Sequence, residues 1–355
     1  MSPENENKDQ SIKITLDDLA KVSMPEPNAM TSAALAAGGA KVYGSISEAS
    51  DPKTQVTEEK GSFLLQGWFY LGVAGLLGAI IGWGICEPRF VDGEGHRWGN
   101  VVIIPLIVAL LCVGFGIAES IVERSAKKAV IRGGICLPMG IVFGFIFEFI
   151  AGIIYAIGMG IVSEMGVQTV KNPAVWIARG IAWMAFGAAG GVVYGIVGMS
   201  SKKTLYGVLG GVIGAGLGGI LFDPIAILTH GGAASRAVGF GLVGMATGVA
   251  VGLVESALKD RWLYVTAGPL AGKQFILYKP RTMVGSDQKC DIYLFKDSNI
   301  LKEHAIIELA GSRIMLRAIG DTYVNGQPVR QQVLMSGAVV QIGRYAFRYQ
   351  ERQRN

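Results

Sequence analysis

The chain has 355 residues and a formal net charge of +5; 51% of its residues are hydrophobic and only 17% are charged. Soluble globular proteins usually carry about 25% charged residues and about 7% glycine, whereas this chain contains 51 glycines. The combination of high apolar content and excess glycine excludes a chain that is disordered throughout. It indicates membrane helices that pack closely together.

Residues 1–60 are polar and acidic and show no periodic apolar face. This composition predicts a disordered tail, which we place in the cytoplasm. The first residues, MSPENENKDQ, contain neither a basic segment nor an apolar segment, so we predict no secretory signal.

Residues 61–258 are almost continuously apolar and are predicted to form a transmembrane helical domain. Six runs reach the length of about 20 residues that a helix needs to cross a bilayer. They are residues 62–86, 101–122, 129–149, 175–199, 204–224 and 235–257. A further apolar run, residues 149–162, continues directly from the third. It either extends a tilted helix or forms an interfacial or re-entrant piece.

The six runs resemble three related hairpins. The first run of each hairpin ends on an acid, and the second begins near an arginine. The acids are Glu87, Glu148 and Asp223, and the arginines are Arg97, Arg179 and Arg236. Two interpretations of the acids stay open. They form an ion or proton site inside the membrane, or they lie at the outer interface where each helix ends. Glu119 and Glu255, near the opposite ends, are interpreted as solvated or paired.

Glycines recur at four-residue steps within these runs, as in Gly187, Gly191 and Gly195. Such steps place small residues on one helix face, where backbones approach closely in lipid. We therefore expect a tight bundle, with further contacts between copies in a homo-oligomer. A match to G-x-G-x-x-G starts at Gly214, but it lies inside an apolar run and follows no strand, so nucleotide binding is not predicted.

Lysine and arginine gather in the segments ERSAKKAVIR, SSKK and KDRW, which fall on one side of a six-span arrangement. The positive-inside rule places that side in the cytoplasm. We therefore predict a multi-pass protein of the inner membrane that contacts lipid and has both termini in the cytoplasm.

Residues 261–355 consist of short β-branched and aromatic runs separated by Gly, Asn, Asp and Pro, which predicts a β-sandwich or barrel. The four cysteines form no C-x-x-C pair and the three histidines are far apart in sequence. No metal, cofactor or disulfide is predicted. Catalytic motifs such as G-x-S-x-G, H-E-x-x-H and a lysine-containing P-loop do not occur, so we expect a protein that is not an enzyme.

The segments VTAGPLAGKQFIL, TMVGSDQKCDIYL, EHAIIEL and TYVNGQPV occur in that order within residues 262–350. This region resembles the forkhead-associated (FHA) domain family. The resemblance implies an eleven-stranded β-sandwich whose apical loops bind phosphothreonine peptides, and hence a protein partner in the cytoplasm.

The family's phosphate-binding residues are only partly present. Its glycine-arginine pair falls on Gly285 and Ser286, and its serine falls on Leu301. Lys302 stands where a basic residue often follows that serine, and His304 matches the family's structural histidine. An arginine fork supplies strong charge-assisted bonds to a phosphate, so its loss predicts weakened or absent phosphothreonine dependence.

Three further residues, Thr322, Asn325 and Gly326, match the family's threonine and asparagine-glycine loop. The resemblance implies that Asn325 contacts the peptide backbone. The same Asn-Gly dipeptide also suits a tight hairpin turn, and both interpretations stay open.

Taken together, these features predict a membrane-embedded scaffold or adaptor with an FHA-like module for protein–protein interaction. The alternative is a channel or transporter that the FHA-like module regulates, because intramembrane acids often mark ion pathways. Nucleic acid is not a predicted partner, because the basic residues are scattered and form no aromatic-basic patch.

Overall fold

The computed structural model describes the chain from residue 62 to residue 352, apart from a few short gaps. The described residues are 62–91, 94, 97–166, 169, 171–311 and 313–352. The predicted acidic tail, residues 1–60, lies outside them.

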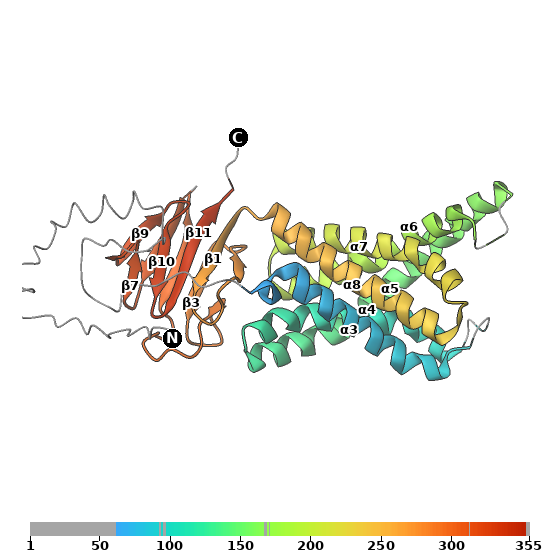
Figure 1. Cartoon of the computed structure of the whole chain (residues 1–355), viewed down its shortest axis with the longest axis horizontal. Helices are drawn as coiled ribbons and strands as arrows, with labels where there is room; N and C mark the ends of the chain where they lie inside the picture. The colour runs from blue at the N-terminus through green and yellow to red at the C-terminus, as the bar shows by residue number, and fades with distance from the viewer. Residues whose placement is uncertain are drawn as a thin grey trace, which may run out of the picture.

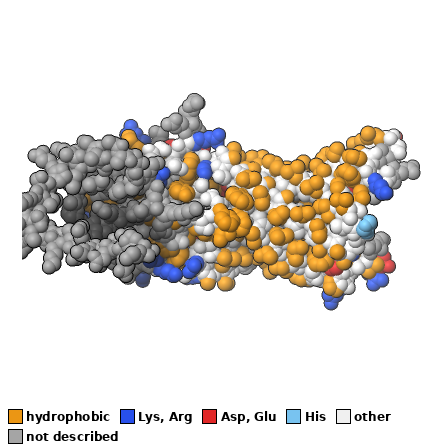
Figure 2. Space-filling view, in the orientation of Figure 1, with side chains coloured by type: hydrophobic (Ala, Val, Ile, Leu, Met, Phe, Trp, Pro, Cys, Tyr) orange, Lys and Arg blue, Asp and Glu red, His pale blue; other side chains and the backbone are white. Residues whose placement is uncertain are grey.

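Six long helices form the first part of the described chain, and all six are long and apolar enough to cross a membrane. They are α3 (Gly67–Cys86), α4 (Trp98–Val122), α5 (Ala126–Glu164), α6 (Pro173–Val197), α7 (Ser201–Leu228) and α8 (Gly232–Leu258). Two short 3-10 helices accompany α3, namely η1 (Phe63–Leu65) and η2 (Glu87–Arg89). The predicted helical bundle is confirmed, and apolar side chains cover the face of it that Figure 2 shows.

The helices close into a ring, because each packs against the next along the chain and α3 packs against α8. Glycine makes the closest contacts. A Cβ atom added to Gly187 would lie 1.9 Å from the carbonyl oxygen of Gly211, and one added to Gly75 would lie 2.1 Å from that of Gly244. No other residue type permits backbones this close. These glycines therefore face neighbouring helices, as the four-residue steps predict.

Two helices differ from the predicted runs. Helix α5 is one continuous helix of 39 residues, about 58 Å long, so residues 149–162 extend the third helix and Glu148 lies inside it. The distal parts of α5 and α6 project beyond the other helices (Figure 1). The sequence predicted that helix α7 ends at Asp223. This prediction was wrong, because α7 continues through Pro224 to Leu228. A proline removes only one hydrogen-bond donor, and the Asp223 side chain is held by an ion pair with Arg179.

The remaining residues form a β-module of eleven strands in two packed sheets (Figure 1). The six-stranded sheet has the order β2-β1-β11-β10-β7-β8, and the five-stranded sheet has the order β4-β3-β5-β6-β9. The strands are β1 (Arg261–Ala267), β2 (Gln274–Ile276), β3 (Arg281–Gly285), β4 (Ile292–Tyr293), β5 (Ala305–Ala310), β6 (Arg313–Ala318), β7 (Thr322–Val324), β8 (Gln327–Pro328), β9 (Gln331–Leu334), β10 (Val339–Ile342) and β11 (Tyr345–Glu351). The eleven-stranded sandwich that the resemblance implies is confirmed.

The core of the β-module lies between the two sheets. Along β6, buried residues alternate with more exposed ones, as expected for a strand with one face toward a core. Leu263, Leu316, Tyr345 and Phe347 are almost completely buried there. This packed core holds the strands in place. The strands in turn determine where the connecting loops begin and end.

Candidate functional site

The loops after β3 and β4 bring together the residues at the predicted phosphate position. The backbone N–H of Ser286 donates to the carbonyl oxygen of Leu301 at 2.9 Å, and its hydroxyl donates to the carbonyl oxygen of Ile300 at 2.8 Å. A Cβ atom on Gly285 would lie 2.1 Å from the carbonyl oxygen of Lys302. The two loops therefore need glycine at position 285 to pack together.

His304 lies beneath these loops and is only 1% exposed. Its Nδ1 accepts a hydrogen bond from the backbone N–H of Leu301 at 3.1 Å. The hydrogen of the neutral ring is then assigned to Nε2, which donates to the carbonyl oxygen of Asp321 at 3.1 Å. His304 thereby joins the β4–β5 loop to the β6–β7 loop.

The threonine and the asparagine-glycine pair lie at opposite ends of β7. Thr322 is buried, and its hydroxyl donates to the carbonyl oxygen of Gly320 at 3.1 Å. Asn325 and Gly326 form the β7–β8 turn, with φ angles of 51° and 82°, so the hairpin interpretation is confirmed. The Asn325 side chain accepts from the backbone N–H of Val339 at 2.9 Å. The structure does not place Asn325 beside Ser286, and its contact with a peptide stays a prediction.

The three acids of the bundle differ in their surroundings. Glu87 lies 2.6 Å from Arg236, and Asp223 lies 2.8 Å from Arg179. The first ion pair joins the end of α3 to α8, and the second joins α7 to α6. Each pair therefore links two neighbouring hairpins of the ring. Glu148 is half-buried on α5 and has no ion-pair partner within 4.0 Å among the described residues.

A small cavity lies within the helix ring, and none of these three acids lines it. Its volume is about 30 Å³, and its walls are almost entirely apolar. The residues around it include Ile107, Phe115, Trp183, Phe186 and Phe240. Because a buried water needs two to four polar partners, this interior offers little that would hold water or an ion.

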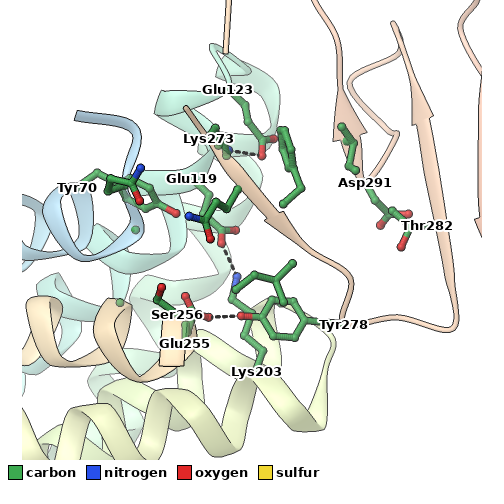
Figure 3. A pocket seen from close by; sticks show the side chains of 18 of the residues that line it. Tyr70, Glu119, Glu123, Lys203, Glu255, Ser256, Lys273, Tyr278, Thr282 and Asp291 are labelled. Carbon is green, nitrogen blue, oxygen red and sulfur yellow. Dashed lines mark hydrogen bonds and ion pairs between the residues drawn. The ribbon is translucent and has the colours of Figure 1, made fainter. Parts of the chain in front are cut away.

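A larger, polar cavity of about 140 Å³ separates the bundle from the β-module (Figure 3). Acids and bases from both parts line it, together with two tyrosines. They include Tyr70, Glu119, Glu123, Arg132, Lys203, Glu255, Lys273 and Tyr278. We refer to this group as the junction network.

Two acids of the junction network, Glu123 and Glu255, are buried, Glu119 is half-buried, and all three are bound. Lys203 lies 2.7 Å from Glu119 and its ammonium also lies over the ring of Tyr194. Across the junction, the Tyr278 hydroxyl donates to Glu255 at 2.7 Å. Burial raises the pKa of Tyr278 well above its ordinary value, and the charge of Glu255 raises it further. Tyr278 therefore stays protonated and continues to donate.

A second set of contacts fastens the β1–β2 and β3–β4 loops of the β-module to the end of α4 and the start of α5. Glu123 lies 2.8 Å from Lys273 of the β-module and 3.4 Å from Lys128 of the bundle. The ammonium of Lys128 also donates to the carbonyl oxygen of Cys290 at 2.6 Å. Burial raises the pKa of the Cys290 thiol, which keeps it an unreactive thiol at this contact.

The sequence predicts that Glu119 and Glu255 lie near one end of the bundle, but it does not identify their partners across the junction. Lys273 precedes strand β2 and Tyr278 follows it, and nothing in their local sequence shows that they meet α4 or α8. The sequence feature that indicates paired charges at this end of the bundle is the set of lysine- and arginine-rich turns.

The fold and its loops define the β-module as an FHA-type β-sandwich. Residues 264–353 match the family model described as "Inner membrane component of T3SS, cytoplasmic domain". Over 86 residues the chain is 38% identical to the glycogen accumulation regulator GarA of Mycolicibacterium smegmatis, a match that covers 23% of this chain and 54% of that protein. It is 35% identical over 86 residues to the oxoglutarate dehydrogenase inhibitor of Corynebacterium efficiens, covering 23% and 60%.

Among solved structures, the FHA domain of the CT664 protein from Chlamydia trachomatis is 26% identical, with a TM-score of 0.25. That match covers 27% of this chain and 100% of the solved chain. The chain spans a little over half the length of the two curated relatives it matches.

Proposed function

We propose that this chain is a multi-pass inner-membrane adaptor whose FHA module recruits a protein partner at the cytoplasmic face. The observation that carries this proposal is the buried junction network, which holds the module against one end of the bundle. A module held in this way presents its loops at a fixed place beside the membrane. The family match to an inner-membrane component's cytoplasmic domain supports the same arrangement.

The two termini, in this proposal, lie on the cytoplasmic side with the FHA module. The chain acts by binding, without an enzymatic reaction, and nucleic acid is not among its partners. The apolar outer face of the bundle contacts lipid, and copies of the chain also contact each other through that face in a homo-oligomer.

The partner surface, we further propose, has little dependence on phosphothreonine. Leu301 offers no donor to a phosphate, and it stands 47% exposed in the loop. The Ser286 hydroxyl already donates to a carbonyl oxygen of its own module. Of the predicted phosphate residues, Lys302 is an exposed cation but a point charge without the arginine fork.

Titration of the full chain in detergent with phosphothreonine peptides and their unphosphorylated twins tests this proposal. We expect phosphorylation to tighten binding less than about tenfold, because hydrogen bonds to charged groups contribute about 1.5–3 kcal/mol and the main ones are missing. The double variant Ser286→Arg with Leu301→Ser restores both groups and is expected to gain a preference above tenfold. A strong phosphate preference of the unmodified chain would contradict the proposal.

A channel or transporter is the second candidate, because one observation favours it. Glu87 and Asp223 each pair with an arginine near the preceding helix of the ring. The same relation would match Glu148 with Arg97, but these two residues do not form an ion pair. Arg97 instead pairs with Glu94. A carboxyl group left without an ion-pair partner in a membrane helix is costly unless it serves a function.

Replacement of Glu148 by Gln separates the two candidates. If the bundle transports an ion, this change should abolish flux in reconstituted vesicles, because the neutral amide cannot bind or release the ion. In an adaptor, wild-type and Glu148→Gln vesicles show the same background leak. The apolar interior of the ring leads us to expect the second result.

A further inference from the structure

One turn of the bundle carries exposed cations that the protein itself leaves without an acid. Arg124 and Lys127 lie in or next to the turn between α4 and α5, and both are exposed. Neither has a carboxylate within 4.0 Å among the described residues. The neighbouring Lys128 and Arg132 are instead paired with Glu123 and Glu119. Two positive charges are therefore uncompensated at this point.

The equivalent turn between α6 and α7 differs. Lys202 lies 2.6 Å from Asp260, and Lys203 lies 2.7 Å from Glu119. Both lysines of the α6–α7 turn are therefore paired with acids. The open charges of the α4–α5 turn are a property of that turn.

Apolar side chains lie about one helical turn deeper, next to the two cations. Ile121 at the end of α4 is 61% exposed, and Val130 and Ile131 near the start of α5 are 75% and 52% exposed. Helices of this length and composition place such residues at the edge of the hydrocarbon core. The turn therefore combines an apolar surface for acyl chains with charges at the level of the lipid headgroups.

The FHA module closes one side of this surface. The Arg124 guanidinium lies 5.7 Å from the centre of the Phe295 ring, and the Ser125 hydroxyl donates to Gln288 of the β3–β4 loop at 3.2 Å. The contact with the ring face orients the guanidinium without using its N–H donors. Those donors stay available for a phosphate group.

We propose that Ile121, Arg124, Lys127, Val130 and Ile131 form a seat for one anionic phospholipid of the cytoplasmic leaflet. The headgroup phosphate binds Arg124 and Lys127, and the acyl chains pack along Ile121, Val130 and Ile131. The FHA module borders this seat, because the buried Phe295 ring contacts Arg124 and Gln288 contacts Ser125. This seat is independent of the protein-recruiting function proposed above.

Native mass spectrometry of the full chain, equilibrated with phosphatidylglycerol or with phosphatidylcholine, tests the seat. We expect the anionic lipid to be retained preferentially. A basic residue near the membrane surface contributes about 1 kcal/mol to such attraction, so the double variant Arg124→Gln with Lys127→Gln should lose about 30-fold in phosphatidylglycerol retention. The charge-conserving variant Arg124→Lys with Lys127→Arg should retain most of it.

Lys171→Gln serves as the matched control, because Lys171 is an exposed cation at the opposite end of the bundle. It should leave retention unchanged. Equal retention of both lipids, or a double variant that behaves like the control, would overturn the proposal. Displacement of the lipid by millimolar inorganic phosphate, or by a phosphothreonine peptide, would also overturn it, because the site would then serve a soluble anion.

Discussion

Replacing Lys203 with Met is expected to lower the free energy of unfolding by about 3–5 kcal/mol, because it removes a buried cation from the acids of the junction network and leaves only Arg132 beside Glu119. The Lys203 side chain is only 6% exposed and lies 2.7 Å from Glu119. Glu255 is buried close by, and among the described residues its hydrogen-bond donors are the hydroxyls of Tyr194 and Tyr278. Methionine fills similar space but brings no charge. Unfolding of the purified chain in mixed micelles, followed by circular dichroism, measures the loss.

The adjacent residue provides the control for this prediction. Lys202 also forms an ion pair, with Asp260, but its side chain is 56% exposed. Exposed pairs contribute about 0–1 kcal/mol, so Lys202→Met should cost little. Equal effects of the two variants would show that the junction network is not a buried charge cluster. A triple variant, Lys203→Met with Glu119→Gln and Glu255→Gln, should recover part of the lost stability, because it removes both acids and leaves only the partly exposed Arg132 without its ion-pair partner.

The fold could be predicted well because its signals are repeated along the chain. Each apolar run of about 20 residues indicates a span by itself, and glycine at four-residue steps indicates which face packs. The β-module combines short strands with segments that resemble FHA domains over almost its whole length. Local sequence therefore determined both the element types and the class of the C-terminal sandwich.

The ends of the helices were less predictable, because tertiary contacts decide them. Pro224 is a common helix terminator, yet α7 continues beyond it while Asp223 pairs with Arg179 of another helix. The continuous apolar sequence around Glu148 gave no indication of where α5 ends. A proline or an acid indicates that a helix is inclined to end at that position. Contacts with the neighbouring helix determine whether the helix ends there.

The junction network shows the same limit for the candidate site. Glu255 and Tyr278 are separated by 23 positions in the chain, and Glu123 and Lys273 by 150. A single sequence shows each charge but not its partner across two folded units. The residues on the apical loops, in contrast, could be named from motifs, although only the structure places Asn325 at the far end of β7.

Replacing Gly187 with Ala is expected to destabilise the bundle by about 1–3 kcal/mol, because the added methyl group overpacks a contact between backbones. The new Cβ atom would lie 1.9 Å from the carbonyl oxygen and 2.3 Å from the carbonyl carbon of Gly211. Both are backbone atoms, so no flexible side chain can move aside. Helices α6 and α7 must separate, and the contacts on either side of Gly187 weaken with them. Unfolding in mixed micelles measures the change.

Gly160→Ala is the matched control, since it introduces the same methyl group on another membrane helix. A Cβ atom at Gly160 meets nothing within 4 Å, and alanine forms helix more readily than glycine. This variant should therefore be as stable as the unmodified chain or slightly more stable. If Gly187→Ala were equally well tolerated, close backbone contact between glycines would not be what holds the helices together. The difference between the two variants isolates the contribution of packing from that of helix propensity.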